Sequence, residues 1–353
     1  MVQVPAIVVA GEGRAAKAVY GQPKVYLEVG GRALVARVVA VLQRVPEVSE
    51  VWVVGNAAHL ETVLGESSLQ AELRKPVVVV QEFRNLLENG WQTYRRLLSG
   101  AGPQGRDPDP ADDALPVLYL SGDLPFATPQ EISCFVRRSL EGEWDYSLGL
   151  CTAESLRPFA AEAGQAGMDM AVFNVAGGRF RQSNLHLIRP GRIGNRQVVE
   201  EMYEHRYQKQ FGNVIALAWR LLRRKGGGLW VMLNYAVMVL AGWADRHGLR
   251  RLRDLLRGLV PFSRLEKAIS RLMGARYRFV VTELGGCAAD VDSEADFDVC
   301  RLRFDAWTEQ QRELAERCYG PLPLPEGVDG PAPKLRRLED GRGKASLAAD
   351  TSA

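Results

Sequence analysis

Four short apolar runs in the first third of the chain constrain its fold more than any other feature. They are "AIVVA" (6–10), "EVWVVG" (50–55), "PVVVVQ" (76–81) and "PVLYLSGD" (116–123). Runs of β-branched residues that do not alternate with polar ones are typical of parallel strands buried on both faces. Segments 32–45 and 85–98, which lie between these runs, space their apolar residues as helices do. The pattern predicts an α/β fold class, with a mostly parallel sheet and helices on both faces.

The middle of the chain differs from its beginning in both pattern and charge. Residues 191–280 have helical spacing over most of their length and carry 18 Lys/Arg against 6 Asp/Glu. From residue 321 onward the chain has too little apolar content to offset the entropy lost on ordering. We therefore expect four segments: a core (1–189), a basic helical insertion (190–276), a return to the core (277–320) and a disordered tail (321–353).

The loop after the first run fits two incompatible motifs. Gly11, Gly13 and Ala16 match the G-x-G-x-x-G/A pattern of a dinucleotide-binding fold. That fold needs a helix of several turns directly after the glycines, and Gly21 and Pro23 would break such a helix early. The context therefore excludes the dinucleotide interpretation.

A loop that surrounds the phosphates of a nucleoside triphosphate explains more of the same residues. Gly11 and Gly13 would let the backbone approach the ligand closely, because neither has a side chain to obstruct it. Lys24, which follows Pro23, would reach the phosphates and neutralise the charge that builds up during phosphoryl or nucleotidyl transfer. The loop thus indicates nucleotide chemistry.

At this point the chain resembles the MobA-like NTP transferases, which are nucleotidyltransferases with the GT-A fold and include molybdenum-cofactor guanylyltransferases and several cytidylyltransferases. The resemblance rests on "AGEG" (10–13), "PKVYLEVGGRAL" (23–34), "LYLSGDLPFATPQEI" (118–132) and "DVDSEADF" (290–297). It implies a GT-A, Rossmann-like sheet, with Lys24 and Asp123 as catalytic residues. It also implies a nucleotide-binding set of Ala10, Gly11, Gly13, Arg14, Lys24, Gln81 and Asn89. The family's loop usually has Arg where this chain has Ala15, and the neighbouring Arg14 and Lys17 could supply that charge.

The same resemblance implies a magnesium ion. Asp123 directly follows an apolar run, and ligands of open α/β sheets bind beyond the carboxyl ends of the strands. A carboxylate there suits Mg²⁺, a hard cation that prefers oxygen ligands. Asp292 matches the family's second metal ligand, and Asp290 is the weaker candidate. An N-cap of the following helix is the alternative for Asp292.

The acceptor side is less specific. Asn184, in the strand-like "QSNLHLIRP" (182–190), is a candidate acceptor residue. For the basic insertion, the alternatives are a solvated helical face, a helix pair that covers the sheet, a peripheral membrane contact through 220–257, and a cleft for an anionic, lipid-linked phosphate acceptor. We expect no nucleic acid partner, because aromatic residues are not interleaved with the arginines and no DNA- or RNA-binding motif is present.

Taken together, the sequence predicts a Mg²⁺-dependent nucleotidyltransferase that transfers NMP from an NTP to a phosphorylated small-molecule or lipid-linked acceptor. Two alternatives stay open: a GT-A glycosyltransferase, in which Asp290-Val291-Asp292 would be a D-x-D metal motif, and a non-catalytic nucleotide-binding or membrane-associated scaffold. No secretory signal is recognisable, so we expect a cytoplasmic protein with peripheral membrane contact as an option.

Overall fold

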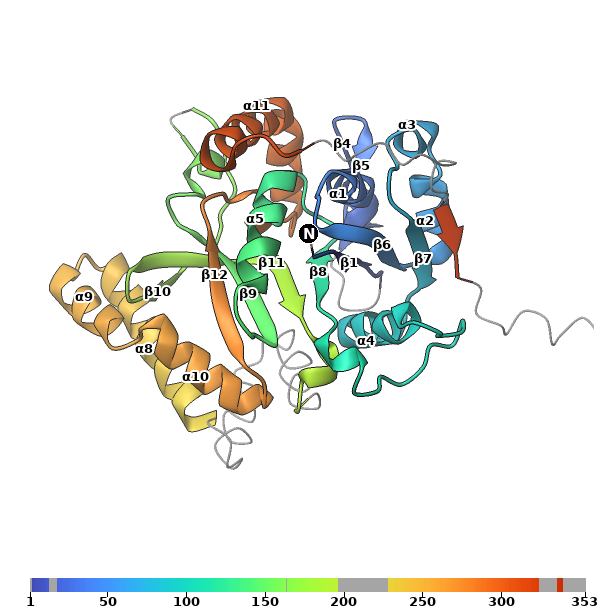
Figure 1. The fold of residues 1–353 in the computed structure, drawn as a ribbon. Coiled ribbons are helices and arrows are strands. Elements are labelled where there is room, and N and C mark those ends of the chain that lie inside the picture. The colour runs from blue at the N-terminus through green and yellow to red at the C-terminus, as the bar shows by residue number, and fades with distance from the viewer. Residues whose placement is uncertain (1, 13–17, 163, 196–227, 324–334, 339–353) are drawn as a thin grey trace, which may run out of the picture.

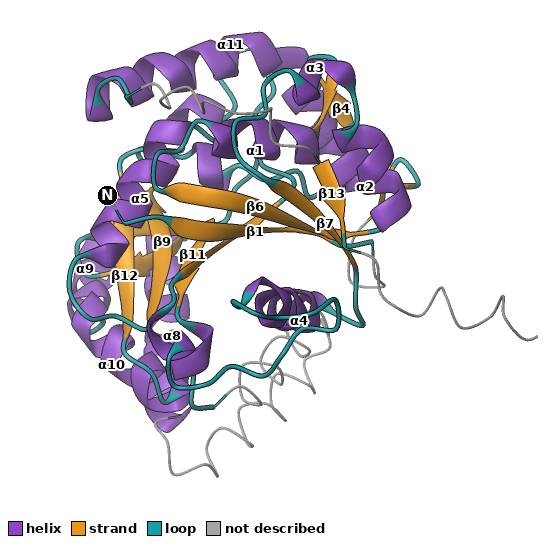
Figure 2. Ribbon diagram, turned by 45° about the vertical axis from the view of Figure 1, so that its right-hand side comes forward, coloured by secondary structure: helices purple, strands orange, loops and turns teal. Residues whose placement is uncertain are grey.

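The protein is built around one mixed sheet with helices on both of its faces (Figures 1 and 2). The computed structural model describes residues 2–12, 18–162, 164–195, 228–323 and 335–338. In spatial order the strands are β12 (Tyr277–Thr282), β9 (Tyr146–Thr152), β11 (Gly178–Ile188), β8 (Val117–Ser121), β1 (Val4–Ala10), β6 (Val48–Gly55), β7 (Val77–Gln81) and β13 (Leu335–Arg337), and β10 (Phe173–Val175) pairs with β11.

The predicted α/β fold class is confirmed. The four apolar runs form β1, β6, β7 and β8, which are parallel neighbours in the sheet, and segment 277–284 contains β12. The sheet is mixed because β11 runs antiparallel to both β8 and β9. The sequence pattern did not predict this reversal.

Helices cover the sheet on both faces, as Figure 2 shows. One face carries α1 (Leu34–Gln43), α2 (Ala57–Leu64), α3 (Ser67–Gln70) and α5 (Pro129–Leu140), with α11 (Glu294–Tyr319) packed on α5. The other face carries α4 (Leu86–Leu97) and, near β12, α8 (Gly228–Arg246), α9 (Arg250–Gly258) and α10 (Phe262–Met273). Two short hairpins, β2 (Ala18–Val19) with β3 (Gln22–Pro23) and β4 (Glu28–Val29) with β5 (Arg32–Ala33), connect β1 to α1.

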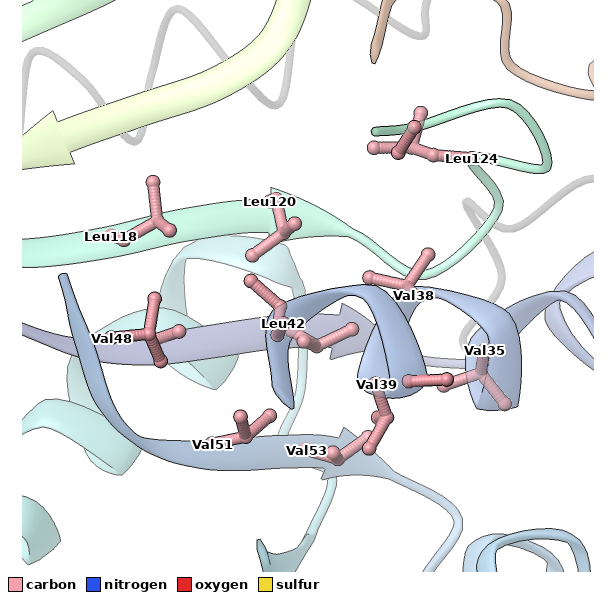
Figure 3. Close-up of a cluster of buried hydrophobic side chains, with 14 of the residues drawn as sticks. Val35, Val38, Val39, Leu42, Val48, Val51, Val53, Leu118, Leu120 and Leu124 are labelled. Carbon is pink, nitrogen blue, oxygen red and sulfur yellow. The ribbon is translucent and has the colours of Figure 1, made fainter. Parts of the chain in front are cut away.

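The largest hydrophobic cluster lies between α1 and the central strands. Val35, Val38, Val39 and Leu42 of α1 point toward β6 and β8, where they meet residues such as Val51, Leu118 and Leu120 (Figure 3). These side chains are almost completely buried. Burying each contributes roughly 1.5–3 kcal/mol relative to exposure, so this cluster fixes the carboxyl ends of β1 and β8 side by side.

The described helices of the basic insertion form an extension at the β12 edge of the sheet (Figure 1). α10 packs on β12, and α8 packs on β10. Residues 196–227, with the basic cluster Arg220 to Lys225, lie outside the described residues. Among the helices described, none combines the length and the apolar character needed to cross a membrane.

The expectation of a disordered tail is wrong for residues 335–337. They form β13, which pairs in parallel with β7 at the edge of the sheet, with Leu335 opposite Val77. Leu335 and Leu338 pack against the clusters on the two faces of the sheet. An unpaired edge strand offers a row of free N–H and C=O groups, and a short segment with two leucines can pair with it even when the surrounding composition is polar. The other residues of the tail beyond 323 lie outside the described residues, apart from Leu338.

Candidate active site

The candidate site lies at the carboxyl edge of the sheet, where β1 and β8 end next to each other. Val9 is opposite Ser121, and the Gly122 N–H donates to the Val9 carbonyl at 3.0 Å. A Cβ on Gly122 would lie 3.4 Å from side-chain atoms of Ala10, Val25 and Val35, which is a tight contact. Glycine at this position therefore lets the loop that carries Asp123 pack closely on the loop that carries Lys24.

Lys24 begins a short 3-10 helix (Lys24–Tyr26) anchored by the buried Val25. Its ammonium Nζ lies 2.5 Å from Asp123 Oδ2 and 2.8 Å from Asp292 Oδ1. Burial alone would lower the pKa of Lys24, but the two carboxylates outweigh it and raise the pKa above its usual value. Lys24 is thus held as a permanent cation between two acidic side chains.

Asp123 is the most buried member of the site, with 1% of its side chain exposed. Its Oδ1 accepts a hydrogen bond from Ser121 Oγ, and its Oδ2 faces Lys24. Asp292 is half exposed. It does not cap the following helix: the cap of α11 is Ser293, whose side chain accepts from the Asp296 N–H at 3.2 Å. The carboxylate of Asp292 therefore forms an ion pair with Lys24 and does not cap the helix.

A buried glutamate of α5 holds the loop between β12 and α11 in place. Glu131 of α5 accepts hydrogen bonds from Thr282 Oγ1 at 3.0 Å and from the Cys287 N–H at 3.1 Å. Burial raises the pKa of the Glu131 carboxyl, and these hydrogen bonds partly oppose the shift. Glu131 thus ties the start of the loop that carries Asp290 and Asp292 to the core of the protein.

Three carboxylates converge at this point, and they fit a divalent cation. Asp123, Asp290 and Asp292 each offer an oxygen, and these oxygens lie within 4.8 Å of one another. Burial raises the pKa of Asp290, as do the neighbouring charges of Asp123 and Asp292, while Arg181 and Lys24 act in the opposite direction. The mutual repulsion of these carboxylates disfavours their ionised form, and a bound cation would relieve it. Carboxylate oxygens are also the ligands that Mg²⁺ prefers.

Two side chains of β11 border this cluster. Arg181, which the sequence analysis missed, donates from Nη2 to Asp290 Oδ1 at 2.9 Å and from Nε to the Ala288 carbonyl at 2.9 Å. Asn184 donates from Nδ2 to the Cys287 carbonyl at 3.4 Å. Asn184 therefore lies beside the loop that carries Asp290. No sequence motif marks Arg181, because its importance depends on the pairing of β11 with β9.

The predicted nucleotide-binding residues lie at the ends of β1 and β7 and in α4. Ala10 ends β1 and is buried. Gly11 follows it, and a Cβ at Gly11 would lie 2.9 Å from Asn89 Nδ2 and 3.0 Å from Glu82 Oε2. The buried Asn89 accepts from the Phe83 N–H at 2.6 Å, so it orders the loop after β7. Gly13 and Arg14 lie outside the described residues, as do Ala15 and Lys17.

The remaining side chains of this region form a network that the sequence analysis did not predict. Gln81 is exposed, and its Oε1 accepts from the Ala57 N–H at 3.1 Å, at the start of α2. Glu82 Oε2 accepts from the Glu12 N–H at 2.7 Å, and Glu12 Oε1 lies 2.8 Å from His59 Nδ1. The first part of the glycine loop is therefore tied to the end of β7 and the first turn of α2.

Replacing Gly11 by alanine is expected to weaken nucleotide binding by about tenfold, which corresponds to roughly 1.4 kcal/mol. The added Cβ would displace the amide of Asn89 and the carboxylate of Glu82, and both groups position the loop. Titration with each NTP would give the change in affinity. Gly102→Ala is the matched control, since a Cβ there meets nothing within 4 Å. Equal affinities for the two variants would show that the close approach at Gly11 is not needed.

Comparisons with known proteins agree with this architecture. No family model matches the chain. A curated relative, 2-C-methyl-D-erythritol 4-phosphate cytidylyltransferase of Chlorobium luteolum, is 26% identical over 135 residues, which are 38% of this chain and 53% of the relative. The chain thus matches about half the length of that relative.

Among solved structures, a hypothetical transferase from Thermus thermophilus is similar with a TM-score of 0.54 and 19% identity, over 84% of this chain and 99% of that one. At this level of identity the similarity concerns the fold alone. The chain therefore has the α/β fold of that structure. The resemblance drawn from its motifs agrees with the partial match to the cytidylyltransferase.

Proposed function

We propose that this chain is a Mg²⁺-dependent nucleotidyltransferase of the MobA-like kind, which transfers NMP from an NTP to a phosphorylated acceptor and releases pyrophosphate. One observation carries the proposal. Lys24, Asp123 and Asp292, which come from three separate segments, meet within hydrogen-bond distance at the carboxyl edge of the sheet. That edge is where open α/β sheets bind their ligands, and the Gly11 loop starts beside it.

In the proposed reaction, an acceptor phosphate oxygen attacks the α-phosphorus of the NTP. A bond forms between that oxygen and the α-phosphorus, the bond from the α-phosphorus to the bridging oxygen breaks, and pyrophosphate leaves with the bonding electrons. No side chain needs to act as a nucleophile, so catalysis depends on positioning and on charge. Lys24 would neutralise charge on the phosphates, and Gly11 would let the backbone approach them.

The residues present fit a magnesium ion, with Asp123 and Asp292 as its ligands and Asp290 as a third. When bound, the ion would neutralise the phosphates and polarise the α-phosphoryl group. Asp123 is fixed by Ser121, and Asp290 is fixed by Arg181, so both carboxylates are oriented by the protein. Glu131 acts behind them by holding the loop that carries Asp290.

Substrate identity is the finer part of the proposal. The curated relative is named a cytidylyltransferase, which makes CTP the first nucleotide to test. Asn184 and Arg181, which border the carboxylates, are the candidate acceptor-side residues. No specific observation favours the glycosyltransferase or the scaffold alternative. Asp290 and Asp292 lie in a cluster that also includes Asp123 and contacts Lys24, as the nucleotidyltransferase proposal expects.

The test is pyrophosphate release from the purified protein with Mg²⁺, using CTP, GTP, UTP and ATP separately. Each reaction is run with and without a pool of phosphorylated metabolites and a lipid extract. We expect release with one nucleotide, dependent on both the pool and Mg²⁺. Tight nucleotide binding without release, under all of these conditions, would favour the non-catalytic scaffold.

A further inference from the structure

Helix α8 presents an apolar face to solvent. Leu233, Tyr235, Val239, Leu240 and Trp243 are between 44% and 56% exposed. With 3.6 residues per turn, these positions lie on one side of the helix. On the opposite side, Ala241 and Ala244 are completely buried against the protein. The exposed side therefore has the apolar composition that is typical of a buried surface, although its side chains are about half exposed.

Helix α9 adds a second apolar stripe. Leu252, Leu255 and Leu259 are spaced i, i+3 and i+7, and their exposures are 40%, 65% and 46%. Leu249, in the turn from α8, is 43% exposed. The two helices are packed against each other as a hairpin. We call the exposed apolar residues of this hairpin, together with the exposed Arg246, Arg250 and Arg251, the α8–α9 surface.

The arginines of the hairpin divide into two groups. Arg253 pairs with Asp245 and Asp254, at 3.1 and 2.8 Å. Arg257 donates to Asn174 of β10 and lies 3.5 Å from Asp245. These two arginines hold the hairpin together and against the core. The second group, Arg246, Arg250 and Arg251, is exposed and forms no salt bridge with any residue that the structure describes.

We propose that the α8–α9 surface lies on a membrane that contains anionic lipid, with its leucines and aromatic rings at the level of the headgroups. Contiguous clusters of exposed apolar side chains mark interaction sites in proteins. Interfacial helices combine such a face with Arg or Lys, and Trp and Tyr suit the boundary between headgroups and acyl chains. Arg246, Arg250 and Arg251 are complementary in charge to anionic headgroups.

Charge also disfavours a second copy of the chain as the occupant. In a symmetric dimer the same patch meets itself, so the interface would contain two sets of Arg246, Arg250 and Arg251. Like charges across an interface oppose association, whereas an anionic surface attracts all three. The inference rests on α8 and α9 alone, so its test is independent of the proposed nucleotidyl transfer.

Vesicle flotation with the full chain tests the inference. Vesicles of phosphatidylcholine alone are compared with vesicles of phosphatidylcholine and phosphatidylglycerol. We expect the wild type to float with the anionic vesicles and only weakly with the neutral ones. The triple variant R246Q/R250Q/R251Q should lose at least about tenfold in partitioning, since each arginine near an anionic surface contributes several-fold. L252S/L255S, which changes two exposed leucines, should also bind more weakly.

The matched control removes three exposed arginines elsewhere, as R44Q/R317Q/R336Q. It has the same net charge as the triple variant, and we expect it to float as the wild type does. Equal losses in both triple variants would show that net charge alone drives binding and would overturn the proposal. So would an absence of flotation, or a dimer in sedimentation equilibrium that L252S/L255S dissociates.

Discussion

Asp123→Asn is expected to reduce nucleotidyl transfer by at least about a thousandfold, with the fold intact. The carboxylate is the closest partner of Lys24 and the most buried of the three acidic groups, so its loss removes charge at the centre of the site. Removing one preorganised electrostatic group at a reacting centre typically costs about 10²–10³ in rate, and losing a metal ligand adds to this. Asparagine has nearly the same shape, so packing around Ser121 and Gly122 should persist.

Pyrophosphate release with the preferred nucleotide measures the loss, and thermal unfolding checks the fold. Asp305→Asn, an exposed position on α11, is the control for removal of one carboxylate. A rate within tenfold of the wild type would rule out Asp123 as a catalytic group. Lost turnover with unchanged nucleotide affinity would separate a role in the reaction from one in binding.

Lys24→Met is expected to have two effects, on rate and on stability. The rate should fall by about 10²–10³, because the variant lacks the positive charge that, in the proposed reaction, neutralises the phosphates. Breaking a buried ion pair by removing one partner costs about 3–5 kcal/mol. Since Lys24 is 18% exposed and Asp292 is half exposed, we expect a smaller loss, of roughly 2 kcal/mol, in the free energy of unfolding.

Unfolding of Lys24→Met at increasing Mg²⁺ distinguishes these effects. A divalent cation can replace the lost ammonium among Asp123, Asp290 and Asp292, so Mg²⁺ should stabilise the variant more than it stabilises the wild type. Arg317→Met, which removes an exposed charge on α11, should respond as the wild type does. Equal Mg²⁺ responses in all three proteins would falsify a shared cation site at these carboxylates.

The sequence predicts the half of the site that depends on local pattern. Apolar runs without alternation identify β1 and β8, and residues that follow such strands must meet at one edge of a parallel sheet. Asp123 follows from this reasoning, whereas Lys24 follows from the glycine loop and the Pro23 that precede it. Asp292 follows from the motif before α11, and the structure shows that its neighbour Ser293 is the residue that caps the helix.

The other half depends on pairing between distant segments, which no local pattern encodes. Arg181 reaches Asp290 only because β11 is inserted antiparallel between β8 and β9. Glu131 resembles an ordinary first-turn acid of α5 in the sequence, yet it is completely buried and bound to Thr282 and Cys287. β13 was missed because a three-residue strand in a polar segment gains its stability from the edge that it joins.

The reversed direction of β11 has a geometric consequence. Its first residues lie at the edge where β8 ends, and there Arg181 contacts the acidic loop. The hairpin that joins it to β10 is bound to the helical extension, through Ala176 to Val260 and Asn174 to Arg257. The β10–β11 hairpin thus connects the acidic loop of the site to the α8–α9 hairpin. A membrane beneath the α8–α9 surface would therefore hold the carboxylates in one fixed orientation relative to it, and an acceptor in that membrane would reach them from one direction.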